Sequence, residues 1–289
     1  MKSWPGLIYA LLAAANTRIE KGTTIMKRPL LLSALVALLV GCGAPATTPA
    51  PTLEDMWTPS ILEDDDGELP DGREVVQRMM DFMEGHQELA VEARVTYESV
   101  QGSGQKLQFD MLQRIAVRKP DQFFWVTLRD DATLDRAWYD KGRFRMIRQP
   151  ANLWAEIRLP GGIAEAIQEL VANYMITVPF PDLLSVDPDD RRLDDESTSI
   201  WYVGEAWVDG QWTDHVAIRK PGADIQIWVR QDEPFPAKMA IVYTEDEGMP
   251  GYTARFSKWS NTLPEDPTLF EFTVPPGAER IDVVPVIDR

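Results

Sequence analysis

The sequence is poor in the residues on which most enzymes depend. It holds one cysteine and two histidines among 289 residues. It also lacks CxxC, HExxH and phosphate-binding loop motifs. A single cysteine excludes an intramolecular disulfide. His215 and Asp214 are neighbours in a predicted strand, where adjacent side chains point to opposite faces, so they cannot form a catalytic pair. The sequence therefore predicts a protein that is not an enzyme and binds no metal or other cofactor.

Basic residues are also scarce. The 29 Lys and Arg stand against 46 Asp and Glu, which gives a formal net charge of −17. A nucleic-acid partner needs a basic surface that neutralises phosphates, so the composition argues against one. Hydrophobic residues still make up 44% of the chain, with ten Trp. That content is typical of a folded core, of one large domain or two small ones.

No apolar run is long enough to cross a bilayer. The stretch from Leu30 to Gly41 has 12 residues, whereas a membrane-spanning helix needs about 20. It follows Lys27 and Arg28, as the hydrophobic region of a secretory signal follows its basic region. We therefore expect residues 1–41 to be a signal region, with Met26 as the true start.

The apolar run ends in Leu39-Val40-Gly41-Cys42. These four residues resemble the lipobox of bacterial lipoproteins. The resemblance implies that Cys42 is lipidated, through diacylglycerol and further acyl chains such as palmitate, and that the protein is anchored to a membrane. Gly43, in place of the Asp that favours inner-membrane retention, points to the outer membrane.

Residues 42–71 are then expected to be a disordered tether, rich first in Pro and Thr and later in acids. The acidic cluster Glu63 to Asp66 does not have the spacing of an EF-hand calcium loop. We expect the folded domain to span residues 72–289.

Within that domain, two segments have helical spacing of apolar residues: residues 73–85, with Asp71 as N-cap, and residues 163–174, after Gly161-Gly162. The rest alternates with a period of two and has tight turns, such as those around residues 140–142 and 209–210. The last predicted strand covers residues 269–275. This pattern predicts a mainly β (α+β) fold: one strongly curved antiparallel sheet of about eleven strands, forming an open β-barrel. The N-terminal helix and the central helical insert would cover its concave side.

Large apolar side chains are abundant on the predicted strands. If the helices leave the concave side partly open, such residues line a cavity for a hydrophobic ligand. If they fill it, the same residues form an ordinary core, and the sequence leaves both possibilities open. The candidate lining residues are Phe109, Phe124, Trp138, Met146, Trp154, Trp228, Met239, Tyr243 and Phe256.

Several segments between residues 72 and 282 resemble a family of predicted periplasmic proteins, domain-of-unknown-function family 2092. They include "RKPDQF", "WYDKGRF", "HVAIRKPGADIQIWV" and "LFEFTVPPGAERI", in that order. The family is similar in fold to the lipoprotein carriers LolA and LolB and to the sensor RseB. The resemblance implies an acyl-binding cavity inside an open barrel and supplies no catalytic residues. Arg118 and Arg129 are candidates for the inner-strand arginine that controls the lid in the carriers.

These observations support two hypotheses. The first is a lipid-anchored, periplasm-facing envelope protein that binds or carries an acyl chain, a lipid or a lipoprotein. The alternative is a regulatory or scaffolding module, not an enzyme, that binds a protein partner in the envelope. In both, the Cys42 anchor makes the membrane a partner.

Overall fold

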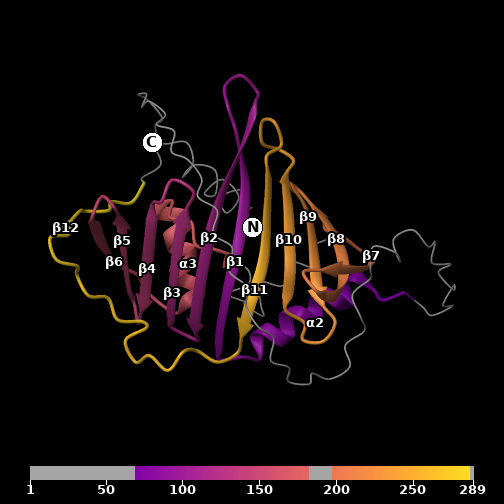
Figure 1. The fold of residues 1–289 in the computed structure, drawn as a ribbon, viewed down its shortest axis with the longest axis horizontal. Helices are drawn as coiled ribbons and strands as arrows, with labels where there is room; N and C mark the ends of the chain where they lie inside the picture. Colours follow the sequence, from indigo (N-terminus) through magenta and orange to yellow (C-terminus); the bar gives the residue numbers. More distant parts are fainter. Residues whose placement is uncertain (1–68, 182–196, 287–289) are drawn as a thin grey trace, which may run out of the picture. The chain divides into compact units, whose positions relative to one another are not determined.

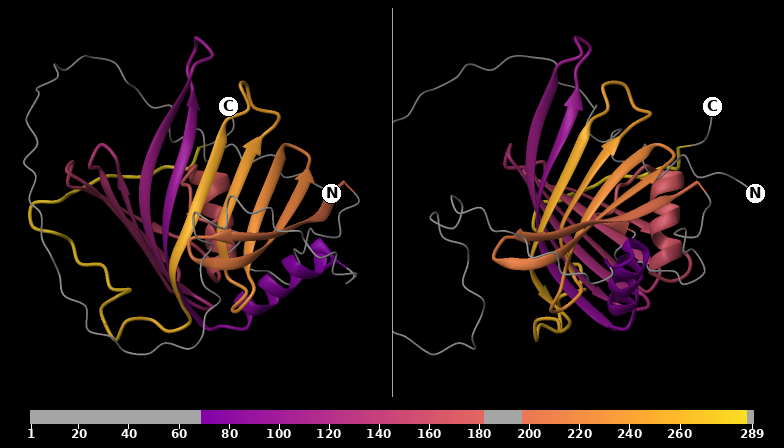
Figure 2. Two further views of the ribbon diagram at one scale, coloured as in Figure 1. Left: turned by 45° about the vertical axis from the view of Figure 1, so that its right-hand side comes forward. Right: turned by 90° about the vertical axis from the view of Figure 1, so that its right-hand side faces the viewer.

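The computed structural model describes residues 69–181 and 197–286, which form one sheet of twelve strands and two helices. The strand order is β12-β6-β5-β4-β3-β2-β1-β11-β10-β9-β8-β7 (Figure 1). β12 and β7 are therefore the two ends of the described sheet, which is open. Figure 2 shows the sheet twisting and curving around the helices. The predicted fold class is confirmed.

The strand bounds follow the predicted alternation closely. They are β1 Glu88–Val100, β2 Lys106–Arg118, β3 Gln122–Arg129, β4 Leu134–Asp140, β5 Arg143–Gln149, β6 Leu153–Arg158, β7 Ser199–Val208, β8 Gln211–Lys220, β9 Ala223–Arg230, β10 Pro236–Tyr243, β11 Gly251–Ser260 and β12 Glu279–Arg280.

The sheet consists of two meanders joined in the middle. β1 to β6 form one antiparallel meander and β7 to β11 form the other. The meanders meet where β1 pairs antiparallel with β11, from Tyr97 opposite Tyr252 to Ala90 opposite Ser260. We call this ladder the seam.

Two tight turns have the conformation that their sequences predict. Lys141 and Gly142 between β4 and β5 both have positive φ, and so do Asp209 and Gly210 between β7 and β8. Paired positive φ angles are those of a type I′ turn, whose twist matches that of the flanking strands. These two turns therefore set the register in which β4 pairs with β5 and β7 pairs with β8.

Both helices lie on one face of the sheet, which we call the inner face; the opposite face is the outer face. α2, Gly72–Glu84, contacts β7, β8 and β9. It buries Val75, Val76, Met79 and Met83 in a cluster that contains residues of β8 and β9. α3, Ile163–Tyr174, buries one side in the larger cluster, which contains residues of β1 to β6. Met239 and Trp259 pack against both clusters and connect them.

Both helices begin where the sequence predicts. The Asp71 side chain accepts a hydrogen bond from the Arg73 backbone N–H at 2.9 Å, which caps α2. A Cβ on Gly72 would lie 2.6 Å from the Trp201 carbonyl carbon, so only glycine lets the start of α2 approach β7 so closely. At α3, the Gly162 N–H donates to the Glu165 carboxylate at 2.9 Å.

The predicted strand over residues 269–275 is wrong. This stretch is extended or turn-like and pairs with no strand in the described part of the chain. It belongs to residues 261–278, which we call the strap. The alternating apolar residues of this stretch are partly buried, since Phe270 is buried and Phe272 half-buried. Both pack on the outer face of the sheet and do not belong to a strand of it.

After the strap, the chain passes around the edge of the sheet. β12 pairs in parallel with β6, and the Ile281 N–H continues the ladder to the Trp154 carbonyl at 2.8 Å. Val283 then packs against the larger core cluster, and the Val286 N–H donates to Asn173 of α3 at 2.7 Å. The C-terminal segment therefore runs from the outer face to the inner face and covers the β6 edge.

Neither described helix has the length and apolar character needed to span a membrane. Within residues 69–181 and 197–286, no three or more His, Cys, Asp or Glu side chains are grouped as a metal site would require.

Candidate functional site

The inner face of the first meander is organised in rows of cross-strand partners. One row is wholly apolar and crosses β2 to β6 at successive paired positions. Its members are Ile115, Trp125, Ala137, Met146 and Ala155. Ile115, Trp125 and Ala137 belong to the larger core cluster, which also contains residues of α3 and against which Met146 packs.

The next row on the same face is polar. It lies two residues further along each strand, about 7 Å away in an extended chain. It consists of Gln113, Thr127, Asp135 and Arg148, each opposite the next across β2 to β5. Gln113, Thr127 and Asp135 are only 4–6% exposed. We call these four residues the polar row.

The polar row is held by its own hydrogen bonds. Arg148 donates from Nε and Nη2 to the two Asp135 oxygens, at 2.8 and 3.0 Å. Arg129, also on the inner face, donates to Asp135 from Nη1. The Gln113 amide donates from Nε2 to Thr127 Oγ1 at 3.4 Å. A carboxylate with two guanidinium partners is thus buried next to the apolar row.

Burial and hydrogen bonding act on Asp135 in opposite directions. Burial by itself raises the pKa of this carboxyl group, but the hydrogen bonds from Arg148 and Arg129 outweigh it and hold the pKa below its usual value. Asp135 is therefore ionised at neutral pH and neutralises one of the two guanidinium groups.

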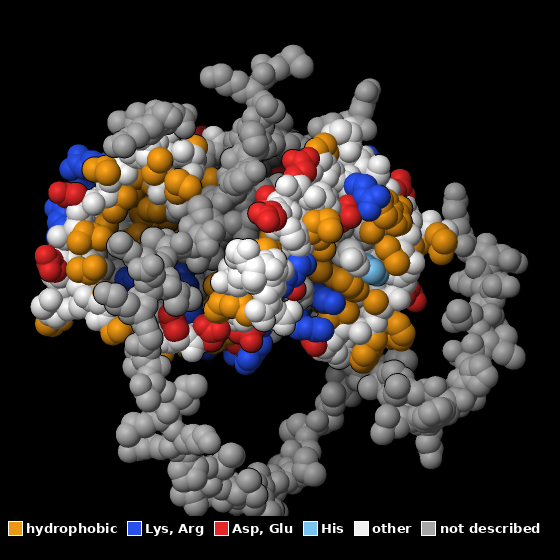
Figure 3. All heavy atoms as spheres, turned by 90° about the horizontal axis from the view of Figure 1, so that it is seen from above, with side chains coloured by type: hydrophobic (Ala, Val, Ile, Leu, Met, Phe, Trp, Pro, Cys, Tyr) orange, Lys and Arg blue, Asp and Glu red, His pale blue; other side chains and the backbone are white. Residues whose placement is uncertain are grey.

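Beyond the polar row lies a half-buried rim. Tyr97 and Phe109 are cross-strand partners on β1 and β2 whose rings stack with centroids 5.6 Å apart. Met111 is half-buried and lies opposite Arg129. Burial raises the pKa of the Tyr97 phenol, and the Arg129 charge acts on it in the opposite direction. Figure 3 looks down on this end of the sheet and shows hydrophobic side chains around a hollow on the side of β3 to β6.

Five of the nine sequence-predicted lining residues are on the inner face. Phe109 lies on the rim, and Met146 belongs to the apolar row. Met239, Tyr243 and Phe256 lie on the second meander and belong to, or pack against, the larger core cluster. The structure therefore brings these five to one face, on both sides of the seam.

The other four do not share that face. Phe124, Trp138 and Trp154 lie on the outer face, where the strap residue Phe272 packs between the two tryptophans with ring centroids 5.1 and 5.4 Å away. Trp228 stacks on His215 at 4.2 Å on the outer face of the second meander, with Lys238 Nζ 4.0 Å from its ring. These four aromatic rings thus pack against other side chains of the protein on the outer face.

The two candidate lid arginines are also separated. Arg118 is on the outer face, paired with Glu88 at 2.8 Å and stacked over Phe270 at 4.9 Å. Arg129 is on the inner face, beside the polar row.

His215 and Asp214 point to opposite faces, as predicted. Asp214 pairs with Arg78 of α2, whereas His215 contacts Trp228 and Gln226. Burial lowers the pKa of His215. The prediction that these two neighbouring side chains point to opposite faces is confirmed.

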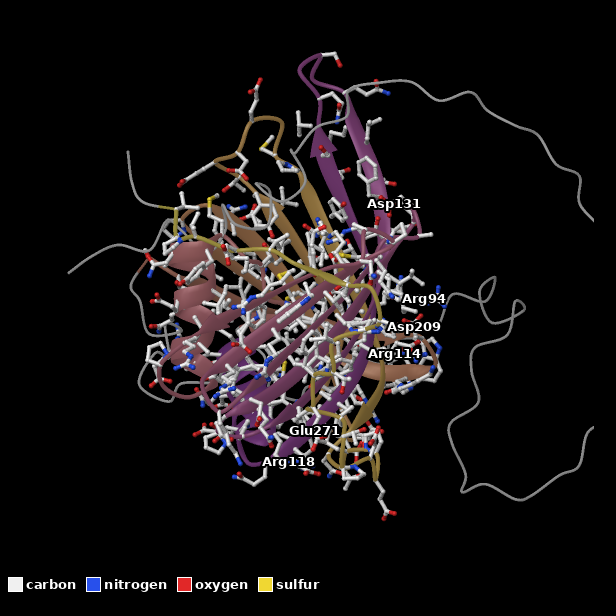
Figure 4. The ribbon with its side chains drawn as sticks, turned by 90° about the vertical axis from the view of Figure 1, so that its left-hand side faces the viewer. Arg94, Arg114, Arg118, Asp131, Asp209 and Glu271 are labelled. Atoms are coloured by element: carbon white, nitrogen blue, oxygen red, sulfur yellow. The ribbon has the colours of Figure 1, made fainter. Side chains whose placement is uncertain are left out.

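The outer face near the seam carries charged side chains, several of which form ion pairs. Figure 4 shows Arg94, Arg114 and Asp209 on the side of the sheet away from α3. Asp209, at the tip of the β7–β8 hairpin, accepts from Arg255 at 3.0 Å, and Arg114 donates to Glu92 at 2.9 Å. These carboxylates offset cations that face one another across the seam, where Arg94 lies opposite Arg255.

A second surface is the edge of β7, which ends the sheet within residues 69–181 and 197–286. Trp201 and Val203 on this strand are 46% and 50% exposed. A bulge between Tyr202 and Gly204 interrupts the pairing of β7 with β8. Edge strands with exposed apolar side chains are sites at which another chain can pair.

Sequence reasoning missed the polar row. The signal was present in β2, where Gln113 takes an inward position between the apolar Met111 and Ile115. Thr127 and Asp135 interrupt the inward apolar positions of β3 and β4 in the same way.

The predicted lipidation residue, Cys42, lies outside the residues that the structure describes.

Among solved structures, the chain is similar to an uncharacterised conserved protein from Thermus thermophilus, with 9% identity and a TM-score of 0.43 over 72% of this chain and 97% of that one. It is also similar to the lipoprotein LppX from Mycobacterium tuberculosis, with 15% identity, a TM-score of 0.38, and coverage of 67% and 97%. A third is MucB in the Pseudomonas aeruginosa MucA/MucB complex, with 12% identity, a TM-score of 0.38, and coverage of 68% of this chain and 60% of that one.

No curated protein matches the chain. The family model described as "Predicted periplasmic protein (DUF2092)" matches residues 72–284. The chain belongs to this family of predicted periplasmic proteins.

Proposed function

We propose that this protein is a lipid-anchored envelope protein, not an enzyme, that binds a hydrophobic ligand on the inner face of its sheet. The ligand is an acyl chain, a lipid or the lipid-modified end of a lipoprotein. The family description supports a periplasmic setting, and the Leu39-Val40-Gly41-Cys42 sequence supports an anchor. We propose the outer membrane as the site of that anchor.

The observation that carries the proposal is the half-buried apolar rim of the inner face. The rim residues Tyr97 and Met111 pack against the core cluster but stay accessible, as do Met146 of the apolar row and Ile241 of β10. Accessible apolar side chains that gather on one face offer a hydrophobic ligand a surface to contact. A binding surface combines accessible apolar side chains with a few polar groups that orient the ligand, and the polar row supplies those groups.

The test is native mass spectrometry and lipid extraction of the protein purified from its own envelope, followed by titration with a fluorescent fatty-acid probe. Wild-type protein should carry extractable acyl lipid beyond its covalent anchor and should bind the probe. Met146→Arg, which places a charge in the apolar row, should weaken probe binding at least about tenfold. Leu128→Arg is the matched control, because Leu128 is on the same meander and already 41% exposed. A wild-type protein that carries no such lipid and ignores the probe would refute the proposal.

The β7 edge favours a second candidate function, the binding of a protein partner by strand addition. Photocrosslinking in intact cells from position 203 should then give a discrete protein adduct. Position 242 is the control, because Val242 is 39% exposed but lies on β10 inside the sheet. Equal labelling from both positions would exclude the edge as a specific partner site.

A further inference from the structure

We propose that the polar row is a head-group subsite for a lipid whose uncharged head group carries both a hydroxyl donor and an oxygen acceptor, as in an acylglycerol. This inference rests on the proposed function and specifies its ligand. The acyl chain would lie along the half-buried rim formed by Tyr97, Phe109 and Met111, and the head group would bind at Gln113 and Arg129.

The first argument is an unused acceptor at Gln113. This side chain is on the inner face and 5% exposed. Its Nε2 donates to Thr127 Oγ1 and to the Met111 sulfur, at 3.4 and 3.6 Å. In the described part of the chain, Gln113 Oε1 has no hydrogen-bond partner. Most buried side-chain acceptors are paired, and an unpaired one costs free energy, so this oxygen is suited to accept a bond from a ligand.

The contacts fix the orientation of the Gln113 amide. A thioether sulfur accepts hydrogen bonds and cannot donate them, so the group 3.6 Å from the Met111 sulfur is the NH₂. Turning the amide would place two acceptors against each other. The unpaired atom is therefore the oxygen, and the matching ligand group is a donor such as a hydroxyl.

The second argument is the donors of Arg129. A guanidinium has five N–H donors. Among the described residues, the Arg129 guanidinium makes one hydrogen bond, from Nη1 to Asp135, and the side chain is 31% exposed. Both oxygens of Asp135 also accept hydrogen bonds from Arg148. Arg129 thus has donors left for a carbonyl or ester oxygen of a ligand, as does the more exposed Arg148.

The local charge indicates an uncharged head group. Arg129 and Arg148 share the single carboxylate of Asp135. A second carboxylate, Asp131 in the turn between β3 and β4, lies close enough to interact electrostatically with both arginines. Two cations and two anions leave no excess positive charge, so the cluster fits polar oxygens better than a phosphate.

The experiment compares two ligands that share one acyl chain. Monolauroylglycerol has free hydroxyl groups and methyl laurate has none. Each competes with a fluorescent fatty-acid probe for the full-length protein, and the preference is the Kd of methyl laurate divided by that of monolauroylglycerol. The preference should fall about tenfold, equivalent to about 1.4 kcal/mol, in Gln113→Leu. It should be unchanged in Gln108→Leu, which alters an exposed amide on the same strand.

Each other outcome is decisive. An unchanged preference in Gln113→Leu, with both ligands still bound, overturns the head-group subsite and leaves the proposed function standing. Failure of the wild-type protein to bind either ligand overturns the proposed function itself. If Gln113→Leu does not fold, Gln113→Met keeps the length of the side chain, removes the acceptor oxygen and gives the same readout.

Discussion

At the scale of single residues, Asp135 shows how a charge is accommodated on an apolar face. Its side chain is 8% exposed, yet Arg148 approaches both of its oxygens. Losing a charged hydrogen-bond partner from a buried site is costly because the remaining groups stay desolvated. The carboxylate therefore stabilises the fold as well as shaping the site.

We expect Asp135→Asn to lower the free energy of unfolding at neutral pH by about 2 kcal/mol. Because the folded-state pKa of Asp135 lies below its unfolded value, the stabilisation is full above about pH 4. It is lost as the pH falls through the folded-state pKa. Urea unfolding from pH 7 to pH 2 would therefore show a shallower loss of stability in the variant.

The matched control is Asp224→Asn, which changes an ion pair with Arg219 that is largely exposed on the outer face. It should unfold close to wild type at neutral pH. If Asp135→Asn and Asp224→Asn behave alike, Asp135 is not the buried partner described above.

The candidate site could be predicted only in part, because alternation in the sequence does not say which face of a strand is inner. In β3, Phe123, Phe124 and Trp125 are consecutive, so both faces are aromatic. Phe123 and Trp125 pack under α3, whereas Phe124 packs against Trp138 on the outer face. A strand with apolar side chains on both faces implies that another part of the chain packs on each face. Here α3 packs on the inner face and the strap packs on the outer face.

At the scale of elements, helices were easier to predict than the strap. α3 begins and ends at the predicted residues, 163 and 174, and α2 lies within one residue of its prediction. Capping residues and apolar spacing are local signals. The strap has the alternation of a strand, but hydrogen-bond pairing depends on a neighbour that the local sequence does not specify. The two-residue β12 was missed for the same reason.

We expect Phe272→Ala to lower the free energy of unfolding by about 1–3 kcal/mol, because it removes a half-buried ring from between Trp138 and Trp154. The intrinsic fluorescence of these tryptophans should also change as water reaches them. Urea unfolding followed by fluorescence measures both effects.

Val274→Ala is the control for the strap, since Val274 is 45% exposed two residues further along. It should leave both the stability and the spectrum nearly unchanged. A wild-type spectrum in Phe272→Ala would contradict the stacking of the strap on the outer face.

At the scale of the whole molecule, the membrane anchor is a prediction of the sequence alone. We expect Cys42→Ser to move the protein from the membrane pellet to the soluble periplasmic fraction, because it removes the thiol that receives the lipid. Mass spectrometry of the wild-type N-terminal peptide should show the added acyl mass. Wild-type protein that is soluble and carries no added mass would contradict the anchor.

The seam also has a consequence for how the domain assembles. Within each meander, strands that are neighbours in the chain pair across short turns, which close quickly. The seam instead joins β1, near the start of the domain, to β11, near its end. Contacts between such distant parts of a chain form slowly. The polar row lies wholly in the first meander, on β2 to β5. For a chain that emerges from its N-terminus, the four strands of the polar row are thus available before β11, the strand that completes the seam.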